Sequence, residues 1–141
     1  MQTYTIHIEG YWRDKNKAGI PSYSGIYFVF IATYNDPNDT ISLIKLLYVG
    51  ENENVRRAVT ENPDFAYWRS FLIAGEELCF AAAEMASAGR TAVRAAIVFN
   101  LRPPANTEFK DVPWQTGFQV FITGRTKFLK EHLIVNKKGN T

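Results

Sequence analysis

The sequence has one cysteine, two histidines and no long apolar stretch. Because Cys79 is alone, an intrachain disulfide is excluded, and no window approaches the length of a membrane span. Residues 1–20 contain no apolar core of a signal peptide, so we expect a cytoplasmic protein. His7 and His132 lack the spacing of zinc ligands or of a hydrolase triad, and no glycine-rich phosphate loop is present. These absences leave few kinds of catalytic or metal site.

The length and net charge of the chain limit the classes of protein that remain. The 141 residues are 46% apolar, which is enough to bury a core without a disulfide or a metal. They predict a single domain over residues 1–141, with its core at about 22–124. The formal net charge of +2 is too small to indicate a nucleic-acid partner by itself.

The apolar pattern predicts an α+β fold. Runs rich in β-branched and aromatic residues predict strands at 2–9, 25–34, 41–48, 77–85 and 118–122. Residues 10–24 have a loop composition, and the dense turn residues at 35–39 indicate a hairpin. We expect a small central antiparallel or mixed sheet flanked by helices and built from the strands at 25–34, 41–48 and 77–85.

Three helices are predicted from their apolar faces and end signals. The first runs to about Thr60 with Asn52 as its N-cap. Pro63 and Asp64 open the second, with Phe65, Trp68 and Leu72 at core spacing and Gly75 as its stop. The third spans about 90–101, with Ser87 or Thr91 as the cap and Pro103-Pro104 at its end.

Three short motifs occur in a fixed order along the chain. They are Gly25-Ile26-Tyr27, then Tyr48-Val49-Gly50 before a helix, then Arg102-Pro103-Pro104-Ala105-Asn106 after a helix. The order and spacing resemble the GIY-YIG nuclease family, over roughly residues 25–106. The runs Leu47–Val55 and Asn106–Asp111 are similar to a bacterial branch of that family.

The resemblance implies metal-dependent hydrolysis of phosphodiesters. In the family a tyrosine helps to activate a water, an arginine on the first helix steadies the phosphate, and a glutamate on the later helix holds a divalent cation. Mg²⁺ or Mn²⁺ would then be the cofactor, since hard cations prefer carboxylates.

Two positions depart from the family pattern. The arginine position, ten residues after Tyr48, is Ala58, and the glutamate position, twelve residues before Asn106, is Arg94. Alanine has no donor, and a guanidinium has no lone pair for a metal. Both departures indicate a site that has lost its chemistry, formed by Tyr27, Tyr48, Ala58, Arg94 and Asn106, with no metal ligand and no confident catalytic residue.

The residues expected to contact nucleic acid are Tyr27, Tyr48, Arg56, Arg57, Arg94 and Asn106. Each also has a structural interpretation: the tyrosines as strand aromatics, Arg56 and Arg57 as a solvated helix face, and Asn106 as a partner for backbone groups after the prolines. The nearest carboxylates are Glu51, Glu84 and Glu108, and none lies on the helix that should supply the ligand.

Three functions remain open at this point. The first is a catalytically silent GIY-YIG-like domain that still binds the phosphates of DNA or RNA. The second is a diverged, active endonuclease that uses Mg²⁺ or Mn²⁺. The third is a protein-interaction or regulatory domain with a vestigial cleft and an unknown partner. A basic tail could add a nucleic-acid contact or be a solvated end: Arg125, Lys127, Lys130, Lys137 and Lys138.

Overall fold

The computed structural model describes residues 1–107 and 117–136. Glu108–Asp111 of the motif region, and Lys137 and Lys138 of the basic tail, lie outside the described residues. The strands are β1 (Gln2–Arg13), β2 (Gly25–Asn35), β3 (Thr40–Asn52), β4 (Glu76–Glu84), β5 (Phe118–Gly124) and β6 (His132–Val135). The helices are the 3₁₀ helix η1 (Asp14–Gly19), α1 (Val55–Thr60), α2 (Phe65–Arg69) and α3 (Arg90–Leu101).

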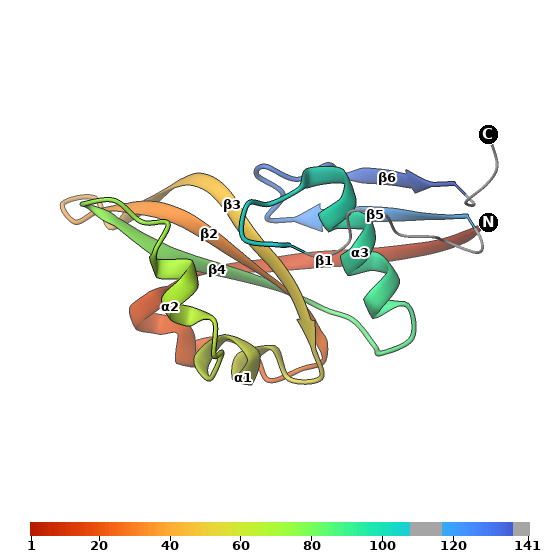
Figure 1. Ribbon diagram of the computed structural model, residues 1–141, viewed down its shortest axis with the longest axis horizontal. Helices are drawn as coiled ribbons and strands as arrows, with labels where there is room; N and C mark the ends of the chain where they lie inside the picture. The colour runs from red at the N-terminus through yellow and green to blue at the C-terminus, as the bar shows by residue number, and fades with distance from the viewer. Residues whose placement is uncertain (108–116, 137–141) are drawn as a thin grey trace.

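All of these strands form one mixed sheet in the order β3-β2-β4-β1-β5-β6 (Figure 1). The pair β1–β5 is parallel, and every other neighbouring pair is antiparallel. The prediction of an α+β fold with β2, β3 and β4 adjacent is therefore confirmed. The strand β6, which no sequence signal predicted, extends the sheet beyond β5.

Apolar residues are buried on both faces of the sheet. One core joins β2, β4, β1 and β5 to Val93, Ala96 and Ile97 of α3. The other joins the opposite faces of β2 and β4 to Val59 of α1 and Trp68 of α2. Phe28 and Phe30 pack in the first core and Val29 and Ile31 in the second, which explains why the buried part of β2 is apolar on both faces.

The segment 10–24 is not the loop that its composition predicted. The strand β1 continues to Arg13 through a register shift between Gly10 and Trp12, and η1 follows directly. Glycine and charged residues give this stretch a loop composition, so the sequence did not indicate a strand. The strand forms because pairing with β4 supplies its hydrogen bonds.

The predicted helix ends were wrong in three places. The N-cap of α1 is Asn54, whose side chain accepts a hydrogen bond from the Arg57 backbone, while Asn52 accepts one from Asn54. The N-cap of α3 is Gly89 at φ +82°, without a side-chain cap. The second helix ends at Arg69, before Leu72 and Gly75.

No helix within residues 1–107 and 117–136 is long and apolar enough to cross a membrane.

Candidate functional site

The site is organised around two tyrosines on neighbouring strands. Tyr27 of β2 pairs with Gly50, and Tyr48 of β3 pairs with Val29, so the two side chains are diagonal neighbours. Their ring centroids lie 6.1 Å apart. The buried Trp68 of α2 closes the cluster, with its ring 5.2 Å from Tyr48 and 6.3 Å from Tyr27. The separate motifs of the sequence therefore form one aromatic cluster.

Gly50 makes this close approach possible. A Cβ atom at residue 50 would overlap the phenol ring of Tyr27, which lies directly over the glycine. The glycine of the second motif thus serves the tyrosine of the first, because only a residue without a side chain admits the ring.

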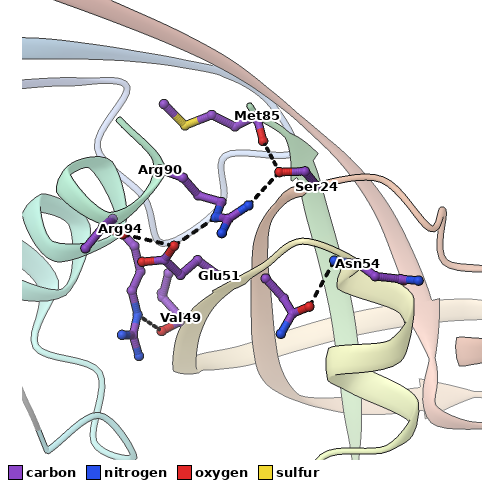
Figure 2. A network of polar contacts seen from close by, with 9 residues as sticks. Ser24, Val49, Glu51, Asn54, Met85, Arg90 and Arg94 are labelled. Atoms are coloured by element: carbon purple, nitrogen blue, oxygen red, sulfur yellow. Dashed lines mark hydrogen bonds and ion pairs between the residues drawn. The ribbon is translucent and has the colours of Figure 1, made fainter. Parts of the chain in front are cut away.

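Arg94 reaches the cluster from the helix α3. Its Nε donates to the Val49 carbonyl at 2.9 Å, and its Nη2 donates to the Tyr48 hydroxyl at 3.0 Å. Figure 2 shows the side chain running from α3 toward the Val49 carbonyl. Since β3 is an edge strand, this arginine passes the edge of the sheet to contact a residue of the other core. A positive charge is therefore fixed beside both phenols.

Asn106 covers the same stretch of the β3 edge. Its Oδ1 accepts from the Val49 N–H and its Nδ2 donates to the Val49 carbonyl, both at 2.9 Å. One side-chain amide thereby supplies the donor and the acceptor that a neighbouring strand would supply. The Val49 carbonyl accepts from both Asn106 and Arg94, so the two residues are held at one point.

A polar network anchors the start of α3 above the site (Figure 2). Arg90 donates from Nε to Glu51 at 2.8 Å and from Nη1 to the Ser24 hydroxyl at 2.7 Å. Ser24 in turn donates to the Met85 carbonyl, and the Thr91 hydroxyl donates to Glu51. The Arg90 and Glu51 side chains are only 13% and 16% exposed, so the ion pair is largely shielded from water. Glu51, one of the carboxylates that lie nearest to the tyrosines in sequence, is therefore bound by residues of α3.

Ala58 lies buried in α1 and lines an open pocket of about 310 Å³ on the Tyr27 side of the site. Asn62 in the same pocket donates a long hydrogen bond of 3.4 Å to the Tyr27 hydroxyl. Arg57 also lines the pocket, with its guanidinium 3.6 Å from Glu61 and largely exposed. The position that the resemblance assigns to a catalytic arginine is thus next to Tyr27 but carries no donor.

Arg56 is not part of this arrangement. Its Nε donates to the backbone carbonyl of Ile20, on the segment between η1 and β2. Arg56 is exposed on α1, as the alternative of a solvated helix face expects, and this hydrogen bond ties it to the chain before β2. Tyr27, Tyr48, Arg94 and Asn106 are brought together, and Arg57 lies at the adjoining pocket.

Burial raises the pKa of the Tyr27 phenol above its ordinary value of 10.0. The nearby Tyr48 phenol adds to this increase, and the Arg94 charge partly offsets it. Tyr27 is therefore a neutral phenol near pH 7, which can donate or accept a hydrogen bond but is a poor base.

The donor set does not suit a divalent cation. The groups nearest to the two phenols include a guanidinium, which repels a cation, and Glu51 is bound to Arg90. Across residues 1–107 and 117–136, no three histidine, cysteine, aspartate or glutamate side chains cluster as a metal site would require.

Two contributors were missed from the sequence. Trp68 was assigned to the core alone, although its ring closes the tyrosine cluster, and Asn62 was assigned no role. The Trp68 Nε1–H is buried and has no acceptor among the described residues. The helical spacing of Trp68 predicted that its side chain is buried, but not which residues the side chain contacts.

No family model matches this sequence, and neither the curated proteins nor the solved structures that were searched contain a match.

Proposed function

We propose that this chain is a GIY-YIG-like domain that binds nucleic acid through a phosphate and does not hydrolyse it. The observation that carries the proposal is the Arg94 guanidinium, held by the Tyr48 hydroxyl and the Val49 carbonyl at the centre of the motif residues. A fixed guanidinium beside hydroxyl donors is a suitable partner for a phosphate oxygen, because charge-assisted hydrogen bonds are the stronger kind.

The element order supports the resemblance. The first tyrosine motif begins β2, the second lies in β3, and α1, α2, β4 and α3 follow before Asn106. A wide separation of Tyr27 and Tyr48 would count against the resemblance, and their rings lie 6.1 Å apart.

The two departures explain why we propose binding without cleavage. With alanine at position 58, the position that the resemblance gives to the catalytic arginine has no guanidinium to stabilise charge on the phosphate as a bond breaks, and the Arg57 guanidinium lies toward Glu61. With arginine at position 94, the charge at the expected metal position is reversed. Phosphate binding tolerates this reversal, whereas metal-assisted hydrolysis does not.

The proposal is tested by fluorescence anisotropy with labelled single-stranded and duplex DNA and RNA, in EDTA. We expect binding without divalent ions, and we expect Arg94→Met to weaken it by about tenfold, as for a lost phosphate contact. The negative slope of log K against log salt should become shallower by roughly one, because one counterion fewer is released.

Two variants control this experiment. Arg94→Lys keeps the charge, so it should bind better than Arg94→Met, and Lys15→Glu changes an exposed cation on η1, so it should bind as the parent does. Equal binding by Arg94→Met and the parent, or binding by neither, would rule out the phosphate contact.

A further inference from the structure

A second hollow lies along the outer edge of β3, beyond the prolines that follow α3. It has a volume of about 290 Å³ and is open to solvent. Its walls come from β3, the end of α3, the Pro103-Pro104 turn and the connection between β5 and β6. We call it the β3-edge groove and define it by Ile44, Lys45, Leu46, Leu101, Arg102 and Phe128.

The backbone edge beside this groove has no strand partner. β3 ends the strand order of the sheet, and no other described strand lies outside it. Among residues 1–107 and 117–136, the edge is covered where Ala105 donates to the Leu47 carbonyl and where Asn106 and Arg94 bond to Val49. The stretch at Ile44–Leu46 lies beyond this cover, along the groove, and a register shift against β2 makes Ile44 a bulged residue with no partner on β2. An uncovered strand edge is a template for pairing with another extended chain.

The groove presents apolar side chains to solvent. Ile44 and Phe128 are 42% and 43% exposed, whereas Leu46 below them is buried in the core that contacts α3. Large apolar side chains left exposed in a hollow are typical of an interaction site. The strand edge and these side chains together favour a ligand with an extended backbone.

The charge of the groove is positive. Lys45 and Arg102 are both exposed, and neither forms an ion pair with another described residue. No carboxylate from residues 1–107 or 117–136 lines the groove. Arg102 is fixed at the C-cap of α3 in the left-handed conformation, where its N–H donates to the Val98 carbonyl at 2.7 Å. The guanidinium lies 5.0 Å from the Phe99 ring centroid.

We propose that the β3-edge groove binds an extended, acidic segment of another protein, which adds a strand to the outer edge of β3. The added strand pairs its backbone with β3 and places an apolar side chain between Ile44 and Phe128. The carboxylate next to that apolar residue points to the opposite face of the added strand and pairs with Lys45, and a carboxylate at the end of the segment pairs with Arg102. This mode of recognition takes affinity from backbone hydrogen bonds and specificity from alternate side chains. It does not depend on the nucleic-acid site.

The test uses labelled peptides of about six residues, a usual strand length. One alternates glutamate and valine, the second alternates lysine and valine, and the third is the acidic peptide with alternate backbone nitrogens methylated. We expect only the first to bind, measured by fluorescence anisotropy, and to shift the backbone amide signals of Ile44–Leu46 in NMR spectra. The lysine peptide is repelled, and the methylated peptide cannot donate to the strand edge.

Charge reversal then locates the site. Lys45→Glu combined with Arg102→Glu should weaken the acidic peptide by about tenfold or more, while Lys15→Glu leaves it unchanged. Ile44→Ser should also weaken it, whereas Ile73→Ser, at another exposed isoleucine, should not. The proposal is overturned if the double variant binds the acidic peptide as tightly as the parent does. It is also overturned if the methylated peptide binds, or if neither unmethylated peptide binds. Displacement of the peptide by oligo-dT would also overturn it, because it would identify a general polyanion surface.

Discussion

The Arg94 guanidinium donates to the Tyr48 hydroxyl across the edge of the sheet, with 3.0 Å between Nη2 and the oxygen. Its Nε is held by the Val49 carbonyl at the same time. The contact joins α3, which packs on one face, to the aromatic cluster on the other. Arg94 therefore has a structural role whether or not a phosphate binds.

The first prediction concerns that structural role. Arg94→Met removes two hydrogen bonds to partly buried acceptors, so we expect it to lower the free energy of unfolding by about 1–3 kcal/mol. Urea denaturation of the parent and the variant measures the difference. Arg57→Met, at a largely exposed arginine of α1, is the matched control and should change stability by no more than about 0.5 kcal/mol. Equal losses in both variants would show that the Tyr48 and Val49 contacts add nothing.

Asn106 allows a sharper test, because its amide both accepts and donates at Val49. Asn106→Asp keeps an acceptor for the Val49 N–H but turns an oxygen toward the Val49 carbonyl. We expect it to cost about 1–3 kcal/mol at neutral pH, where the carboxylate is charged. Lowering the pH should recover part of this loss, since a protonated carboxyl can donate to the carbonyl. Thermal melting of the parent and the variant at several pH values measures this loss of stability. A loss that does not change with pH would contradict this account of the Asn106 amide.

Much of the tyrosine cluster follows from local sequence. The apolar run at 25–34, the turn at 35–39 and the return strand place Tyr27 and Tyr48 on paired strands, and the strand period fixes their faces. Glycine at position 50 leaves space for the Tyr27 ring, and Pro103 follows the end of α3. These signals are short-range, so a single sequence carries them.

The remaining features depend on contacts distant in sequence. The segment 10–24 has a loop composition, yet β4 pairs with Gly10, Trp12 and Arg13, and four residues at β6 become a strand only beside β5. Asn52 and Asn54 are equally good caps by composition, and the choice depends on where the chain leaves β3. The contact between Arg94 and Tyr48 joins residues 46 apart in sequence, which no spacing rule anticipates.

The shielded pair of Arg90 and Glu51 at the start of α3 should make the loss of one partner costly and the loss of both partners cheaper. Arg90→Met leaves Glu51 as a shielded charge whose remaining partner among the described residues is the Thr91 hydroxyl, and we expect a loss of about 3–5 kcal/mol. The double variant Arg90→Met with Glu51→Leu removes both charges and should be closer to the parent than Arg90→Met alone. Denaturant titrations of all three proteins check this order, and a double variant less stable than the single one would contradict it.

Ionisation of Tyr27 should make the free energy of unfolding depend on pH in the alkaline range. Because burial raises the pKa of the folded phenol above 10.0, the unfolded chain ionises first as the pH rises. The contribution is complete below the unfolded pKa and is lost as the pH rises toward the folded one. Tyr27→Phe should therefore reduce the fall in unfolding free energy between about pH 8 and about pH 10.5, measured in urea. Tyr23→Phe provides a comparison at a partly buried phenol whose pKa is also raised, by burial and by its hydrogen bond to Glu9, and an unchanged pH slope in Tyr27→Phe would refute the assignment.

The last prediction concerns hydrolysis. We expect no cleavage of plasmid, single-stranded DNA or RNA with Mg²⁺ or Mn²⁺, because Ala58 and Arg94 occupy the positions that the GIY-YIG resemblance gives to its arginine and its metal-binding glutamate. Arg94→Glu alone restores a carboxylate but leaves the transition state without a guanidinium. The loss of one such group typically costs on the order of 10²–10³ in rate. The double variant Ala58→Arg with Arg94→Glu supplies both groups beside Tyr27 and Tyr48, and a divalent-dependent nick in plasmid DNA should appear in it before either single variant. Tyr48→Phe in that background is the control and should abolish the activity. Cleavage by the parent protein that survives repurification and disappears in Tyr48→Phe would instead identify a working nuclease with relocated groups.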